Sequence, residues 1–114
     1  MTKKTTKTIF AKIRDREVPG EFVYEDEQVM AIKDINPQAP IHILIIPKKD
    51  YATLEEIDLD DTLQLHLLQT ARQVAKQLDI NRNYRLIMNV GRQIQDVPHV
   101  HLHLLGGWSD PNHC

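Results

Sequence analysis

The sequence near the C-terminus reads His99-Val100-His101-Leu102-His103-Leu104-Leu105, so histidine alternates with apolar residues. Alternate side chains of a β-strand point to the same face of its sheet. This stretch therefore predicts a strand over residues 99–105. Its three imidazoles share one face, and Val100, Leu102 and Leu104 point into a core on the other.

Working outward, apolar and β-branched runs bounded by turn residues predict the strands 22–25, 29–32, 42–47 and 84–89. The first two form a hairpin across a short polar connection, and residues 34–40 and 90–98 are loops. Apolar residues at helical spacing predict a long helix with acidic residues, Asp60 and Asp61, in its first turn. That apolar set is Leu59, Leu63, Leu67, Ala71, Val74 and Leu78.

Thr8 is a suitable N-cap for a short helix that carries an apolar stripe and ends at Pro19-Gly20. Together these elements predict an α+β fold. We expect a roughly five-stranded antiparallel sheet, covered on one side by helix, with one long helix and one short N-terminal helix.

The length and composition favour one globular domain. The chain has 114 residues, of which 41% are hydrophobic and 26% charged. We expect a frayed, basic start over residues 1–7, a single domain over residues 8–107 and a tail over residues 108–114.

The charge, cysteine content and hydropathy indicate a cytoplasmic protein. A net charge of −2 gives no basic footprint for nucleic acid. The single cysteine, Cys114, cannot form a disulfide within the chain, which favours a reducing compartment. No apolar run is long enough to span a membrane. We therefore expect neither nucleic acid nor a membrane as a partner.

The spacing of the three histidines argues against one shared zinc ion. A strand rises ~3.3 Å per residue, so His99 and His103 lie ~13 Å apart, whereas a zinc–nitrogen bond is only ~2.1 Å. His99 and His101 could share an ion, but no familiar motif supplies further ligands, so a metal-binding protein is an alternative. A central nucleophilic histidine fits better, because one ring nitrogen can attack phosphorus while the other is held by an acceptor.

Further motifs accompany the triad: Ile9-Phe10-Ala11-Lys12-Ile13 with Val18-Pro19, the segment 34–42 running on to Ile46-Pro47-Lys48-Lys49, Asn89-Val90-Gly91, Gln95-Asp96-Val97-Pro98 and Leu105-Gly106-Gly107. With these motifs the chain resembles the histidine-triad (HIT) superfamily over nearly its whole length. It is most similar to the branch of histidine-triad nucleotide-binding proteins, the purine nucleoside phosphoramidases.

The resemblance implies a catalytic mechanism. His101 is the nucleophile that forms a nucleotidyl-histidine intermediate, His99 and His103 support it, and His42 donates a hydrogen bond that orients it. The reaction hydrolyses the phosphorus–nitrogen bond of a purine nucleoside 5′-phosphoramidate to AMP or GMP and an amine. It requires no metal and no cofactor.

The resemblance also implies nucleotide contacts. Asp34 holds the ribose hydroxyls, and Asn89, Gln95 and the Asp96 position lie at the phosphate or leaving group. The base pocket is walled by apolar residues: Ile9, Phe10, Ile13, Val18 and Ile35. The family implies a homodimer with the long helix and a strand at the interface, in which Trp108 reaches the partner's site.

The loop before the triad departs from the family pattern. Ile94 stands where the family has glycine, Asp96 stands where it has serine or threonine, and the loop is about one residue short. Val97-Pro98 resembles the dinucleoside-polyphosphate hydrolase branch. That activity and a non-catalytic nucleotide-binding module are therefore alternatives. We interpret His66 and His113 as structural or solvated, and Lys48-Lys49 as a solvated pair.

Overall fold

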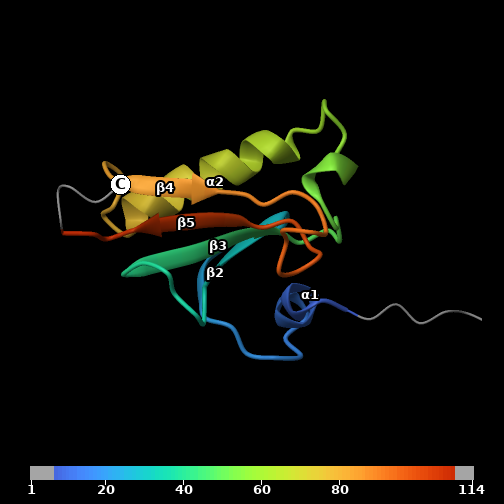
Figure 1. Ribbon diagram of the computed structural model, residues 1–114, viewed down its shortest axis with the longest axis horizontal. Helices are drawn as coiled ribbons and strands as arrows, with labels where there is room; N and C mark the ends of the chain where they lie inside the picture. Colours follow the sequence, from blue (N-terminus) through green and yellow to red (C-terminus); the bar gives the residue numbers. More distant parts are fainter. Residues whose placement is uncertain (1–6, 110–114) are drawn as a thin grey trace, which may run out of the picture.

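A five-stranded antiparallel sheet forms the centre of the computed structural model, which describes residues 7–109 (Figure 1). Its strands lie in the order β1-β2-β3-β5-β4. In chain order the elements are α1 (Ile9–Arg14), β1 (Phe22–Glu25), β2 (Val29–Lys33), β3 (Ile41–Pro47), the 3₁₀ turn η1 (Leu54–Glu56), α2 (Leu63–Gln77), β4 (Tyr84–Ile87) and β5 (Leu102–Gly106). The predicted α+β fold is confirmed. Most of the predicted start and tail, with His113 and Cys114, lies outside the described residues.

The two helices lie on opposite faces of the sheet (Figure 1). The α2 face holds one buried cluster, which includes Ala31, Ile43, Ile45, Val100 and Leu104. The α1 face holds a second, formed by Phe10, Ile13, Met30, Ile32, Leu44 and Ile46. The expectation of helix on one side alone was wrong. Successive residues of β2 and β3 are apolar, so both faces of these strands need cover.

The long helix begins later than predicted. It starts at Leu63 after the N-cap position Thr62, and Leu59 is 96% exposed. The carboxylate of Asp61 accepts a hydrogen bond from the Leu63 backbone N–H, so it sits before the helix rather than in its first turn. Leu59 fits the helical spacing by chance, and spacing alone does not reveal where the chain turns into the helix.

The last two strands are shorter than predicted. β4 ends at Ile87, and β5 begins at Leu102. Before β5 the backbone is engaged elsewhere, because the His99 N–H donates to the Val97 carbonyl and the Val100 N–H donates to the Tyr51 carbonyl. These local bonds hold residues 99–101 out of the ladder that β5 forms with β3.

The short helix α1 is anchored at both ends. Thr8 is its N-cap, as predicted, and its hydroxyl oxygen accepts the Ala11 backbone N–H. At the other end the Arg14 guanidinium donates to the Lys48 carbonyl at 2.6 Å and to the Asp50 carboxylate at 2.7 Å. Helix α1 is thereby fixed beside the end of β3.

Two further observations concern the remainder of the described chain. Helix α2 carries His66, whose Nε2 lies 2.7 Å from the Asp26 carboxylate in the β1–β2 turn. This contact gives His66 a structural position, in line with its interpretation from the sequence. In residues 7–109 no helix combines the length and the apolar character needed to cross a membrane.

Candidate active site

A cavity of about 230 Å³ lies against α1, where the histidine-bearing face of the sheet meets the loop that precedes β5. Its apolar wall comes from six side chains: Ile9, Phe10, Ile13, Ile32, Leu44 and Val97. Its remaining lining is mostly polar: Lys33, Asp34, Ile35, Asn36, Asp96, His101 and His103. The cavity therefore combines an apolar slot with a polar end that contains two imidazoles.

The three histidines of the triad share one face, as the alternation predicted. The ring centroids of His101 and His103 are 4.9 Å apart. The Phe10 ring of α1 lies 4.9 Å from the His101 ring and 6.0 Å from the His99 ring. Phe10 therefore holds the imidazoles against α1.

His99 is fully occupied by hydrogen bonds. Its Nε2–H donates to the Pro47 carbonyl at 2.8 Å, and its Nδ1 lies 3.3 Å from the Thr8 hydroxyl. Because a carbonyl can only accept, the ring proton is on Nε2, and Nδ1 accepts from the hydroxyl. Burial lowers the pKa of His99 and so favours this neutral form. With both nitrogens engaged, His99 has no lone pair to offer a metal ion, which weighs against a metal site on His99 and His101.

His101 has one ring nitrogen held and one available. Its Nδ1–H donates to the His99 carbonyl at 2.7 Å, which fixes the neutral tautomer. Nε2 therefore keeps its lone pair and has no hydrogen-bond partner in the described part of the chain. His101 is only 5% exposed, yet it lines the cavity. This is the geometry of a nucleophile directed at a bound ligand.

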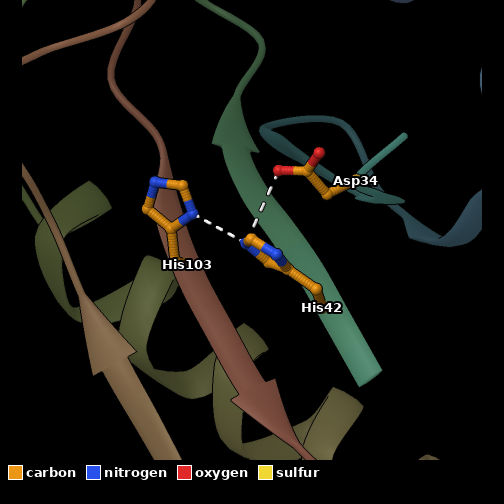
Figure 2. Close-up of side chains that lie close together, drawn as sticks. All are labelled: Asp34, His42 and His103. Atoms are coloured by element: carbon orange, nitrogen blue, oxygen red, sulfur yellow. Dashed lines mark hydrogen bonds and ion pairs between the residues drawn. The ribbon is translucent and has the colours of Figure 1, made fainter. Parts of the chain in front are cut away.

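The rings of His42 and His103 are hydrogen-bonded to each other, and this contact defines their tautomers (Figure 2). The Gln38 backbone N–H donates to His42 Nδ1 at 3.0 Å, so the ring proton of His42 is on Nε2. That N–H donates to His103 Nδ1 at 2.9 Å. His103 consequently carries its own proton on Nε2. Burial lowers the pKa of both rings, which favours these neutral forms.

The predicted partner of His42 was wrong. His42 was expected to orient His101, but its hydrogen bond goes to His103. The register explains the difference, because β3 pairs with β5 so that His42 lies opposite Leu105 and Leu44 lies opposite His103. His42 thus contacts the polar end of the cavity through His103.

Asp34, His42 and His103 have ligand atoms within 4.8 Å of one another, close enough to hold a metal ion (Figure 2). A histidine that ligates a metal donates its other ring N–H to an acceptor. The other nitrogen of His42 instead faces a donor, the Gln38 N–H. A cation at Nε2 would force the ring proton onto Nδ1, against that N–H. The donor set therefore opposes a metal ion here.

Asp34 lies where the sequence placed it, at the cavity. One of its oxygens accepts the Asn36 N–H at 2.8 Å, and the other lies 3.5 Å from His42 Nε2. Neighbouring Ile35 lines the same cavity and is 90% exposed, so a ligand would cover it. The Asp34 carboxylate thus lies beside the apolar slot, and its bond to the Asn36 N–H fixes the backbone turn that carries it.

Gln95 does not lie where the sequence predicted. Its side-chain oxygen accepts the Gly91 N–H, and its amide nitrogen donates to the Ala52 and Val97 carbonyls. These bonds direct the amide into the loop rather than into the cavity. Of the predicted catalytic histidines, His42 and His99 are not among the residues that line the cavity. Two further predicted nucleotide contacts are also absent from the lining. Asn89 is half-buried beyond β4, and Val18 packs against the α1-face cluster.

The two departures from the family pattern lie in different surroundings. Asp96 is exposed and lines the cavity with His101 and His103. Ile94 is 58% exposed and is not part of the lining. Of the two substitutions, only that at position 96 brings a changed side chain to the site.

Five residues of the lining were not predicted from the sequence: Ile32, Lys33, Asn36, Leu44 and Val97. For Ile32 and Leu44 a signal exists in the register. Ile32 pairs with Leu44 and Leu44 pairs with His103, so these three side chains share a face. That inference requires knowing that β3 lies between β2 and β5, which the sequence alone did not give.

Comparison with known proteins places the chain in a family. The HIT domain model matches residues 15–110. An uncharacterized HIT-like protein of Synechocystis sp. is 49% identical over 102 residues, which cover 88% of this chain and 90% of that protein. A 14 kDa zinc-binding protein of Zea mays is 50% identical over 106 residues, which cover 88% of this chain and 81% of that protein.

Solved structures agree with this assignment. A HIT family hydrolase from Clostridium thermocellum superposes with a TM-score of 0.85 at 45% identity, covering 93% of this chain and 95% of that one. The family model spans most of the described residues, including both histidines that line the cavity, whereas the lining residues Ile9, Phe10 and Ile13 precede it. The chain therefore belongs to the HIT domain family.

Proposed function

We propose that the protein hydrolyses the phosphorus–nitrogen bond of purine nucleoside 5′-phosphoramidates through a nucleotidyl intermediate on His101. The observation that carries this proposal is the fixed tautomer of His101, whose Nδ1–H donates to the His99 carbonyl and leaves the Nε2 lone pair for attack. A solved relative, from Clostridium thermocellum, is described as a HIT family hydrolase, which supports hydrolysis as the reaction class.

The reaction proceeds in two displacements at the α-phosphorus. In the first, His101 Nε2 forms a bond to phosphorus as the phosphorus–nitrogen bond breaks, and the amine leaves with a proton taken from water. In the second, water attacks phosphorus, its proton neutralises the hydroxide left by the first step, and His101 leaves with its electron pair as a neutral imidazole. One water is consumed overall, and the products are an amine and a nucleoside monophosphate.

The neighbours of His101 stabilise charge rather than react. His103 carries its proton on Nε2, a tautomer that the bond from His42 enforces, and this N–H donates to a phosphoryl oxygen as negative charge develops there. His99 supplies the carbonyl that holds His101. The apolar slot accommodates the purine base, and the Asp34 carboxylate accepts hydrogen bonds from the ribose hydroxyls.

The test is turnover of adenosine 5′-phosphoramidate by the wild type, His101→Ala and the control His66→Gln, which alters a histidine outside the cavity. We expect His101→Ala to lose activity by about 10³-fold or more while it retains AMP affinity, because a missing nucleophile removes the covalent route. Acid quenching followed by mass spectrometry should find the adenylyl group on His101. Full activity in His101→Ala would exclude the mechanism.

Two other functions are distinguished by the same assay. A dinucleoside-polyphosphate hydrolase would turn over diadenosine polyphosphate faster than the phosphoramidate. The Asp96 carboxylate in the cavity weighs against that reading, because it would repel a polyphosphate leaving group. A non-catalytic binding module would bind AMP but form no covalent intermediate.

We also propose that the protein acts as a homodimer through α2 and a strand, as the family resemblance implies. Exposed leucines on α2 support this, since Leu65 is 57% and Leu68 50% exposed. Light scattering after size-exclusion chromatography should give twice the chain mass, and Leu65→Glu with Leu68→Glu should reduce it. In such a dimer we expect Trp108 to reach the partner's site. A cytoplasmic location stays a prediction from the sequence.

A further inference from the structure

We propose that Asp96 makes the enzyme selective for phosphoramidates whose leaving amine carries an additional positive charge, and that it disfavours anionic leaving groups. This inference rests on the proposed function and names the substrate class of that same site. It arises from a carboxylate at the reacting end of the cavity, where His101 and His103 lie.

Among the charged residues that line the cavity, Asp96 is the one whose side chain has no hydrogen-bond or ion-pair partner in the described residues. Lys33 also lines the cavity, but its ammonium lies 2.6 Å from the Glu21 carboxylate. Asp34 accepts the Asn36 N–H and lies 3.5 Å from His42. In residues 7–109 no hydrogen bond or ion pair engages the Asp96 carboxylate, and it is exposed. Its charge is therefore available to a ligand.

The loop holds Asp96 in place on both sides. The preceding residue, Gln95, is fixed by three side-chain hydrogen bonds to Gly91, Ala52 and Val97. The following residue, Val97, packs against the α1-face cluster. The backbone of Asp96 is thereby held between two fixed residues, and its carboxylate lines the same cavity as His101 and His103, where a ligand would meet its charge.

The charge of Asp96 already acts on His103. Although burial lowers the pKa of His103 overall, the Asp96 charge acts in the opposite direction. A leaving group on the α-phosphorus attacked by His101 meets the same field. Two unit charges several ångströms apart at a partly exposed site change a rate by about threefold to tenfold. The α-phosphate itself is common to all substrates, so the discrimination falls on the leaving group.

The experiment compares kcat/KM at low salt for three adenosine phosphoramidates, whose amine bears a neutral, an ammonium or a carboxylate substituent at equal chain length. The variants are Asp96→Asn, which removes the charge at constant shape, and Asp96→Lys, which reverses it. Asp60→Asn is the control, because Asp60 is an exposed carboxylate outside the cavity lining.

We expect the wild type and Asp60→Asn to favour the ammonium substrate over the carboxylate substrate by about tenfold or more. That ratio should fall towards one in Asp96→Asn and invert in Asp96→Lys, and high salt should weaken it. Hydrolysis of all three substrates with a ratio that does not respond to residue 96 overturns this inference alone. Failure to hydrolyse any of them, with AMP still bound, overturns the proposed function instead.

Discussion

Thr8 connects the N-terminus of α1 to the triad, and removing its hydroxyl should destabilise both. The hydroxyl oxygen accepts the Ala11 N–H, and the hydroxyl proton is directed at His99 Nδ1, 3.3 Å away. Thr8→Val keeps the shape of the side chain and removes both bonds. Losing an N-cap costs ~1 kcal/mol, and leaving the nitrogen of a buried imidazole unpaired costs ~1 kcal/mol more.

The expected loss for Thr8→Val is thus about 2 kcal/mol in the free energy of unfolding. With a urea m-value of about 1.5 kcal/mol/M, this moves the unfolding midpoint down by more than about 1 M. Urea titrations followed by circular dichroism measure the shift. All variants need the same protein concentration, since dimerisation would add to apparent stability.

Two further variants serve as a control and as a test that separates the two hydrogen bonds. Thr8→Ser keeps both and should lie within about 0.5 kcal/mol of the wild type. Thr8→Asp keeps the cap but cannot donate to His99 Nδ1, so its cost should shrink at low pH, where a protonated His99 donates instead. If Thr8→Val and Thr8→Ser shift the midpoint equally, the hydroxyl has no such role and the reasoning fails.

Three other predictions concern the histidines and the glycine that follows β5. Burial holds the pKa of His42, His99 and His103 below the ordinary value, so the unfolded chain binds more protons below about pH 6.5. The contribution of these neutral histidines to the free energy of unfolding is therefore fully present above about pH 6.5. It should fall as the pH drops from there towards the folded-state pKa values. Urea midpoints that stay constant between pH 7.5 and 5.5 would contradict this. His42→Gln removes the hydrogen bond that sets the His103 tautomer, so kcat should fall about 10- to 100-fold with KM little changed. In ¹⁵N NMR spectra the His103 ring proton should be redistributed between its two nitrogens. An unchanged His103 tautomer would rule out this positioning role of His42. Gly107→Ala should cost about 1–2 kcal/mol, because φ is +84° and the added Cβ would lie 3.2 Å from Ile41 Cγ1. Thermal unfolding measures that cost, and a melting temperature equal to that of the wild type would refute it.

The parts of the fold that were predicted depend on local pattern. The hairpin of β1 and β2 and the buried strand β3 follow from β-branched residues between turn residues, and the Thr8 cap follows from its hydroxyl at a helix start. The errors arose where tertiary contacts decide the outcome. Leu59 has helical spacing but lies outside α2, and residues 99–101 alternate like a strand but bond to Tyr51 and Val97.

The sequence predicted several residues of the candidate site but not which hydrogen-bond partners they have. The triad was predicted from its residue types and spacing, whereas Asp34 was predicted from the family resemblance; the structure places His101, His103 and Asp34 at one cavity. Which nitrogen of each ring carries the proton was not predicted, since it depends on Gln38 for His42 and on the His99 carbonyl for His101. Gln95 was misplaced for the same reason. An amide is equally suited to bind a phosphate or to tie a loop, and only its position decides between the two.

The alternation of β2 and β3 between two clusters has a practical consequence for engineering. Ile32 and Leu44 line the cavity from the α1 face, whereas their neighbours Ala31, Ile43 and Ile45 belong to the α2 cluster. Codon-randomised libraries at alternate positions of these strands can therefore remodel the ligand slot while the larger core keeps its composition. Ligand preference could be evolved in this scaffold, with the loss of stability confined to the smaller of its two cores.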